Sequence, residues 1–348
     1  MKIKDTKLVS LDKFIEESLY NKDFGYYMKN NPFGKKGDFI TAPNISILFS
    51  EMIAIWIVAF WENLDCPKKF NLIELGAGNG EMMRILLNTF KKFPKLEKSC
   101  KINILEKSKF LKKIQKKNIN NKKVKWLNNL DKLNNMPCIF VANEFFDALP
   151  IKQFLKIKRK WYEKYVKINA KKNSEFFNMP FNMFNLEKKI KLKISSEQKF
   201  IEYSPQTSEY LENITNKIKI YNGGILIIDY GYIDKEMKDT LQAVSKHKFI
   251  NTLKGFGTSD ITYNINFNLI EKIVNKFGSF FCSTTTQKKF LIKLGILERA
   301  EILSKNMSFS KKADMYFRVK RLIDENQMGD LFKVMFITNK QNKFKLGF

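Results

Sequence analysis

The stretch Phe70–Gly80, which reads Phe-Asn-Leu-Ile-Glu-Leu-Gly-Ala-Gly-Asn-Gly, decides the fold that the rest of the chain is expected to adopt. A short apolar run leads into three alternate glycines, Gly76, Gly78 and Gly80, and apolar residues then recur at helical spacing within Met82–Phe90. Glycine is needed where the chain takes positive φ or where a ligand lies directly against the backbone. The stretch therefore predicts a strand, a glycine turn and a helix, with a nucleotide-like ligand beside the turn.

The spacing of the glycines narrows the choice of ligand. The pattern G-x-G-x-G matches neither the dinucleotide fingerprint G-x-G-x-x-G nor a P-loop, and it is preceded by Glu74 and followed by Glu81. Two carboxylates would repel a pyrophosphate, but they would suit a cofactor with positive charge, such as the sulfonium and amino groups of S-adenosylmethionine. The alternative is a tight strand–helix turn that binds no ligand.

Composition excludes several classes of protein. The 348 residues are 44% hydrophobic, enough for a large core, and 63 basic against 35 acidic residues give a net charge of +28. The lysines are spread along the whole chain and no RNA-binding motif accompanies them, so we expect no nucleic-acid partner. Four scattered cysteines and a single histidine, His247, predict no metal site. No apolar run is long enough to cross a membrane, and we expect a cytoplasmic protein without membrane insertion.

Strand-like runs separated by helical stretches predict an α/β fold with a Rossmann-like, seven-stranded, mostly parallel sheet. The first strand lies in Phe70–Gly80, and six others follow at Lys101–Glu106, Val124–Leu127, Cys138–Ala142, Gly223–Tyr230, Phe280–Thr285 and Lys333–Thr338. We expect four segments: a mainly helical cap at 1–65, a first half of the sheet domain at 66–150, an inserted subdomain at 151–200 that opens with a hairpin, and a second half at 201–348.

A long loop rich in aromatic and turn-forming residues interrupts the N-terminal cap. It runs from Tyr26 to Pro43 and contains Gly34, Gly37 and Asp38. Such a loop is too long to serve as a plain connection. We expect it to fold over the site as a lid, with Asp38 contributing to the cofactor site.

Acidic and amide residues follow the predicted strands, at the sheet edge where parallel sheets bind ligands. Glu106 lies 26 residues after Gly80 at the end of the second strand, where a carboxylate can accept hydrogen bonds from ribose hydroxyls. The alternative interpretation is that Glu106 is a solvent-exposed acid at the end of a strand and binds no ligand.

The segment Asn143–Pro150, after the fourth strand, carries a denser cluster. Glu144 and Asp147 flank two phenylalanines, so they could bind a cationic acceptor, an amine or a guanidinium, while the rings exclude water. The alternative is that Asn143 and Asp147 are local caps and the rings belong to the core.

Taken together, several motifs resemble those of the MidA family of class I S-adenosylmethionine-dependent methyltransferases. They are Gly37–Pro43, Glu74–Gly80, Ala142–Pro150, Ile228–Gly231, Asp239–Leu241 with His247, and Gly257–Thr262, and the resemblance covers nearly the whole chain. It implies that Glu74, Gly76, Gly78, Gly80 and Glu106 hold the cofactor, and that Asn143, Glu144 and Asp147 line the acceptor side. The family commonly has Pro and Arg where Ala77 and Asn79 stand here, which leaves the fine placement of the cofactor open.

The resemblance implies a protein arginine N-methyltransferase, because mitochondrial members of the family methylate an arginine of a respiratory complex I subunit during assembly. Transfer of a methyl group from sulfonium to nitrogen needs no metal and depends mainly on alignment. Two other classes stay open: a non-catalytic assembly chaperone that binds the cofactor, and an NAD-dependent oxidoreductase, which the glycine spacing disfavours. The oligomeric state also stays open, with a homodimer as one candidate.

Overall fold

The computed structural model describes residues 7–29, 32, 41–168, 174–245 and 248–348. The chain forms two compact units, each assembled from three separate segments. Unit 1 comprises residues 1–30, 146–212 and 233–278, and unit 2 comprises 31–145, 213–232 and 279–348. The segment boundaries expected from the sequence at residues 65, 150 and 200 stay a prediction.

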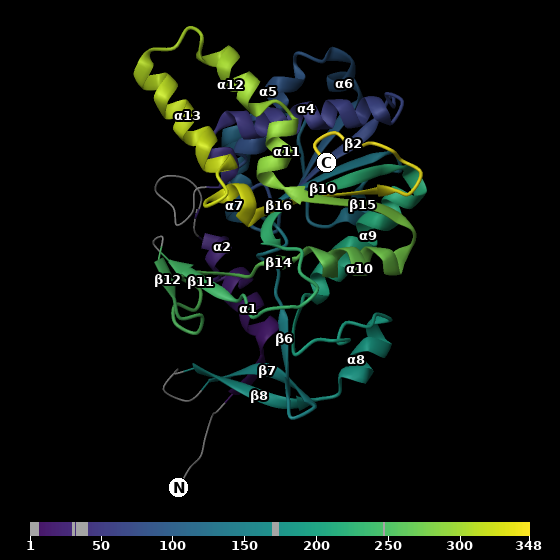
Figure 1. Ribbon diagram of the computed structural model, residues 1–348, viewed down its shortest axis with the longest axis vertical. Coiled ribbons are helices and arrows are strands. Elements are labelled where there is room, and N and C mark those ends of the chain that lie inside the picture. Colours follow the sequence, from purple (N-terminus) through teal and green to yellow (C-terminus); the bar gives the residue numbers. More distant parts are fainter. Residues whose placement is uncertain (1–6, 30–31, 33–40, 169–173, 246–247) are drawn as a thin grey trace. The chain divides into compact units, whose positions relative to one another are not determined.

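Unit 2 contains the sheet that the sequence predicts (Figure 1). Its strands lie in the order β4-β3-β2-β5-β10-β16-β15, and the first five of these are parallel, while β16 runs antiparallel to both of its neighbours. Their bounds are β2 (Phe70–Leu75), β3 (Cys100–Leu105), β4 (Lys125–Leu127), β5 (Cys138–Asn143), β10 (Gly223–Tyr232), β15 (Phe280–Thr286) and β16 (Phe332–Asn339). These seven strands form the main path of an eight-stranded sheet, so the predicted mostly parallel sheet is confirmed with one strand more than expected. The six strands whose bounds were predicted all lie within two residues of those bounds.

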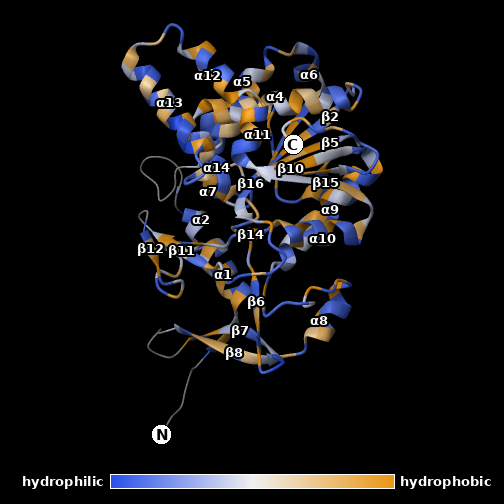
Figure 2. Cartoon of the chain, viewed as in Figure 1, coloured by the Kyte–Doolittle hydropathy of each residue, from blue (hydrophilic) through white to orange (hydrophobic). Residues whose placement is uncertain are grey.

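The middle strands of this sheet are buried on both faces because helices cover them. Every residue of β2 and β5 is buried, and Figure 2 colours β2, β5 and β10 as predominantly hydrophobic. The helices of this unit are α3 (Ala42–Ile45), α4 (Ile47–Asn63), α5 (Glu81–Phe90), α6 (Pro94–Ser99), α7 (Lys109–Ile119), the 3-10 turn Leu130–Lys132, α11 (Gln287–Lys293), α12 (Ile296–Ser304), α13 (Phe309–Ile323) and α14 (Met328–Leu331). The helix α9 (Pro205–Tyr221) crosses the unit boundary at residue 212.

The almost wholly apolar α4 packs against the C-terminal strand. The ring of Phe336, on β16, meets Trp56 at a centroid distance of 5.1 Å and Phe60 at 5.0 Å, both edge to face. Edge-to-face pairs add to the energy of burial because the positive ring edge faces the negative ring centre. These contacts fix the last strand of the sheet to a helix near the start of the unit.

Unit 1 is built on an antiparallel sheet. The expected hairpin is formed by β6 (Lys152–Ile157) and β7 (Lys160–Ile168), which pair with β9 (Phe200–Tyr203), β8 (Ser174–Phe181) and β1 (Lys7–Ser10). A small second sheet contains β11 (Gln242–Ser245), β12 (Lys248–Ile250) and β13 (Asp260–Thr262), and the remaining elements are α1 (Leu11–Tyr20), α2 (Tyr26–Lys29), α8 (Met183–Ile190), β14 (Ile265–Asn266) and α10 (Phe267–Phe277). The strand β1 was not expected in the mainly helical cap.

In the part of the chain that the structure describes, no helix combines the length and the apolar character that crossing a bilayer would require.

Candidate functional site

The glycine turn follows β2 at the point where the order of the sheet reverses, between β2 and β5, which is where open α/β sheets bind ligands. Gly76, Gly78 and Gly80 all have positive φ, of 65°, 52° and 84°, so all three positions favour glycine. At Gly76 a Cβ would also lie 2.8 Å from the ring of Phe145. The sequence prediction of a strand, a glycine turn and a helix is confirmed.

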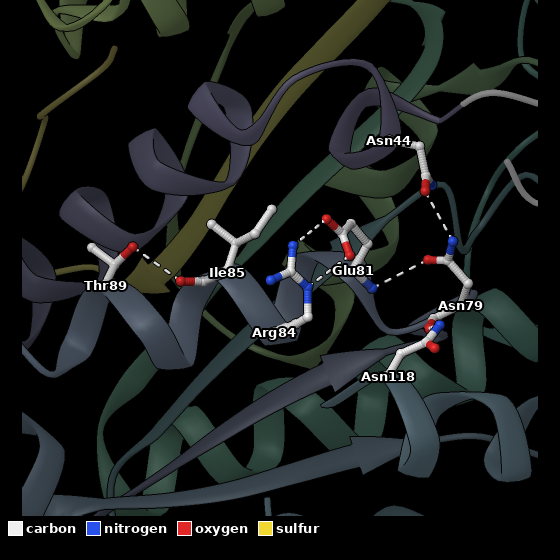
Figure 3. A network of polar contacts seen from close by, with 7 residues as sticks. All are labelled: Asn44, Asn79, Glu81, Arg84, Ile85, Thr89 and Asn118. Carbon is white, nitrogen blue, oxygen red and sulfur yellow. Dashed lines mark hydrogen bonds and ion pairs between the residues drawn. The ribbon is translucent and has the colours of Figure 1, made fainter. Parts of the chain in front are cut away.

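A network of asparagines holds the turn in place (Figure 3). The side chain of Asn79 donates to Asn44 Oδ1 at 2.9 Å and accepts from the backbone N–H of Glu81 at 3.1 Å, while Asn118 donates to the carbonyl oxygen of Asn79 at 2.9 Å. The turn is thereby tied to α3, to the first turn of α5 and to α7. Sequence reasoning treated Asn79 only as a departure from the family pattern and missed this role.

The carboxylate of Glu81 does not add free negative charge beside the turn, as the sequence suggested. It forms two hydrogen bonds with the Arg84 guanidinium, at 2.6 and 2.9 Å (Figure 3). Residues three apart on a helix are neighbours, and this spacing allows the paired contact. The other acidic side chains near the turn are those of Glu74 and Glu106.

Glu106 directly follows β3 and is buried. Its two carboxylate oxygens accept from the backbone N–H of Ser108 and from the Gln115 side chain, each at 2.8 Å. Burial is the larger influence and raises the pKa of Glu106, while these hydrogen bonds lower it. The side chain is thus fixed at the end of the second strand of the sheet, where the sequence expected it.

Gln115 links this acid to the glycine turn, and sequence reasoning missed it. Its amide nitrogen donates both to Glu106 and to the carbonyl oxygen of Gly78, at 2.8 and 2.9 Å, and its oxygen accepts from Trp126 Nε1. A signal was available, because Gln115 lies between Leu111 and Ile119 on the buried stripe of α7. A polar residue on such a stripe needs a buried partner.

Glu74, the next-to-last residue of β2, is buried, and its pKa is raised to about 8, first by burial and then by the charge of Glu106. Its Oε2 atom finds no hydrogen-bond partner among the described residues, and the same holds for the buried Oδ1 atom of Asn143. Both residues line one pocket of unit 2, whose walls also include Thr41, Pro43, Gly78 and Glu144. Two buried acceptors without donors fit a ligand that brings N–H groups or positive charge.

Glu144, the residue after β5, has a left-handed backbone with a φ of 52°. Its N–H donates to the carbonyl oxygen of Ile228 on β10 at 2.9 Å, and its carboxylate accepts from Asn143 at 3.2 Å. A non-glycine residue in this conformation is strained, and such strain gathers at functional sites. The structure therefore brings Asn143 and Glu144 together with Glu74 and the glycine turn in one pocket.

Two predicted site residues are not assigned to this pocket. Asp147 is buried and belongs to unit 1, where it contributes to raising the pKa of Tyr27, after burial and the charges of Asp260 and Tyr20. Asp38 and most of the expected lid loop lie outside the described residues. The roles expected for these residues stay predictions.

Comparison with known proteins accords with this geometry. Residues 52–282 match a family described as "Putative S-adenosyl-L-methionine-dependent methyltransferase". The chain is 30% identical to the mitochondrial protein arginine methyltransferase NDUFAF7 of Xenopus laevis, covering 95% of this chain and 81% of that protein. It is 27% identical to the protein of the same name from Homo sapiens, covering 95% and 80%.

Solved structures share the fold. One from Burkholderia thailandensis, bound to S-adenosyl-homocysteine, superimposes with a TM-score of 0.81 at 23% identity, covering 98% of this chain and 90% of that one. The resemblance to the MidA family is thus confirmed, and the unsatisfied acceptors of Glu74 and Asn143 suit the amino-bearing, cationic cofactor of such enzymes. The chain belongs to the family of S-adenosyl-L-methionine-dependent methyltransferases, and S-adenosyl-L-methionine is its cofactor.

Proposed function

We propose that this chain is a protein arginine N-methyltransferase and that its substrate is a subunit of respiratory complex I during assembly. The names of its relatives support an arginine acceptor. The observation in this chain that carries the proposal is the pocket in which Glu144, held in a strained backbone, lies with the unsatisfied acceptors of Glu74 and Asn143. A carboxylate in such a place pairs with a guanidinium better than it could in water.

Each residue then has a distinct part. Glu74, Asn143 and the glycine turn would bind the amino-acid portion of the cofactor, and Glu106, fixed by Gln115, would bind its ribose hydroxyls. The cofactor supplies an electrophilic methyl group on a sulfonium. The acceptor side would consist of Glu144, with Asp147 three residues later in the chain as a second carboxylate.

The reaction moves one methyl group and one proton. The guanidinium nitrogen gains the methyl group as the sulfonium C–S bond breaks, and the nitrogen loses one N–H proton. Glu144 would orient the guanidinium so that the reacting nitrogen faces the methyl group, since alignment supplies most of the catalysis in a transfer of this kind. The Glu144 carboxylate would also be the acceptor of the N–H proton that the reacting nitrogen loses as the methyl group is transferred.

The test is to incubate the purified protein with complex I subunits and S-adenosylmethionine that carries a labelled methyl group. We expect label in methylarginine after acid hydrolysis, and none when Gly78→Val replaces the wild-type chain, since a side chain at that position would occupy the ligand's place. Label in another amino acid would contradict the arginine acceptor. Cofactor binding by calorimetry with no transfer to any subunit would favour the assembly chaperone. Family membership already favours S-adenosylmethionine over NAD.

A further inference from the structure

A groove in unit 1, remote in sequence from the glycine turn, has the character of a docking site. It is an open depression of about 630 Å³ between the turn of the β6–β7 hairpin, the end of β8 and the start of α8. We call it the hairpin groove, and its walls include Arg159, Lys160, Trp161, Phe181, Phe184 and Glu187. No part of the proposed methyl-transfer chemistry uses these residues.

The cations of the hairpin groove are available to a ligand. Arg159 and Lys160 are exposed, and the ion pairs found among the described residues involve neither of them. Arg159 and the preceding Lys158 form the hairpin turn with φ values of 69° and 45°, a left-handed geometry usually filled by Asn-Gly. The turn therefore presents two long cationic side chains where short ones are the norm.

Glu187 is the single acidic residue of these walls, and its carboxylate already accepts hydrogen bonds from the backbone. One carboxylate oxygen of Glu187 accepts from the backbone N–H groups of Ile194 and Ser195, at 2.8 and 2.7 Å. Four lysines follow it along α8 and the next segment, Lys188, Lys189, Lys191 and Lys193. The hairpin groove thus carries an excess of positive charge, which favours an acidic ligand.

The aromatic walls add an apolar component. Phe184 is 71% exposed, and Trp161 is only partly buried, while Phe181 is anchored by a ring contact with Phe154 at 4.7 Å. Aromatic side chains flanked by cations form the usual anchors of protein interfaces. A ligand that combined acidic residues with an apolar side chain would match both features.

A strand edge beside the hairpin groove favours a polypeptide over a nucleic acid. Among the described residues β8 pairs only with β7, and most of its residues are exposed, so its second edge offers unpaired backbone groups. An extended chain can add to such an edge through main-chain hydrogen bonds. Pro180 at the end of β8 lacks an N–H and limits this pairing to Ser174–Met179.

We propose that the hairpin groove and the open edge of β8 dock an extended acidic segment of the protein substrate. The inference rests on the proposed function for its choice of a protein substrate. It also answers a physical difficulty: a chain of net charge +28 repels a substrate that presents an arginine. An acidic segment elsewhere in the same substrate would offset that repulsion and bring the arginine to the enzyme.

The experiment measures binding of a fluorescein-labelled random copolymer of glutamate and tyrosine to the full-length protein by fluorescence anisotropy. The double variant Arg159→Glu with Lys160→Glu should weaken binding at least tenfold, because two attractive charges become repulsive. The matched control, Lys311→Glu with Lys312→Glu, makes the same change of net charge on the exposed start of α13 and should weaken binding less than twofold. Phe184→Ala should weaken it about threefold without changing its salt dependence.

Equal weakening in the two double variants would overturn the proposal, because it would show that binding depends only on the overall positive charge of the protein. Tighter binding of an oligouridylate, lost in the groove variant alone, would overturn it in favour of a nucleic-acid surface. Hydrogen exchange should slow at the amides of Ser174–Met179 when the copolymer binds, and unchanged exchange there would remove the strand edge from the proposal. None of these readouts needs methyl transfer, so a failure here is distinct from a failure of the proposed function.

Discussion

Glu74 should make cofactor binding depend steeply on pH. Burial and the neighbouring charge of Glu106 raise its pKa to about 8, so the carboxyl group of the free protein is mostly protonated at neutral pH. A cationic cofactor favours the ionised form. Binding of S-adenosylmethionine should therefore expel a proton from Glu74, and the substitution Glu74→Gln, which keeps the shape and cannot ionise, should abolish this effect.

The magnitude follows from the raised pKa. With a pKa of about 8, about 10% of the protein is ionised at Glu74 at pH 7 and about 1% at pH 6. Because only that fraction is ready to bind, the apparent affinity should rise about ninefold from pH 6 to pH 7 and about fivefold from pH 7 to pH 8, or about 1.3 and about 1.0 kcal/mol. At pH 7 the binding of one cofactor should release about 0.9 proton.

Stability of the free protein should show the opposite trend. The folded protein holds the Glu74 proton up to about pH 8, whereas the unfolded chain releases it near the ordinary value of 4.5. The unfolded state therefore binds fewer protons between these values, and the free energy of unfolding should fall as pH rises through that window. Glu74→Gln should flatten this decline.

Titration calorimetry at pH 6, 7 and 8, repeated in buffers of different ionisation enthalpy, measures both affinity and proton release. Glu74→Gln controls for titration of the cofactor's own amino group, which is the same in both proteins. Glu106→Gln should weaken binding overall but shift the pH curve to lower values, since it removes the like charge that raises the pKa of Glu74. Equal proton release by the wild type and Glu74→Gln at pH 7 would refute the reasoning.

Three further substitutions test other parts of the pocket. Asn79→Ala removes the contacts with Asn44 and with the start of α5, and at about 1 kcal/mol for each of the two hydrogen bonds it should weaken cofactor affinity by up to about thirtyfold by calorimetry. Gly76→Ala should lower the free energy of unfolding by about 1–3 kcal/mol in denaturant titrations, because of its positive φ and the ring of Phe145, and Phe145→Leu should restore part of the loss. Glu144→Gln should leave cofactor affinity unchanged while methyl transfer falls about 100-fold, or about 3 kcal/mol of transition-state stabilisation; a joint loss of binding and transfer would place Glu144 in the cofactor shell.

The sequence predicts the sheet well because each of its strands is a local pattern. β2, β5 and β10 are predominantly apolar runs with turn residues at their ends, and such runs are recognisable without knowledge of the fold. The positions of Glu74 and Glu106 followed in turn, since the ends of parallel strands meet at one edge of the sheet.

The sequence could not predict contacts between residues that lie far apart in the chain. The contact of Asn79 with Asn44 joins residues 35 positions apart, and polar residues at such spacing carry no periodic signal. The short strand β1 is defined by its pairing with β7, more than 150 residues later, and four residues before a helix read naturally as part of the helical cap. The ion pair between Glu81 and Arg84, in contrast, joins residues only three apart on one helix, so it could have been predicted from the sequence.

The position of β16 between β10 and β15 has a consequence for synthesis of the protein. The last residue of unit 1 is Gly278. The sheet of unit 2, in contrast, is complete only when β16 (Phe332–Asn339) has been added between β10 and β15. While the chain is still emerging from the ribosome, β10 therefore presents a long apolar strand edge whose native partner has not yet been translated. Such an edge can pair with another chain. A stop codon that removed only the last twenty residues would leave the sequence of the pocket intact and would still yield a protein that is prone to aggregate.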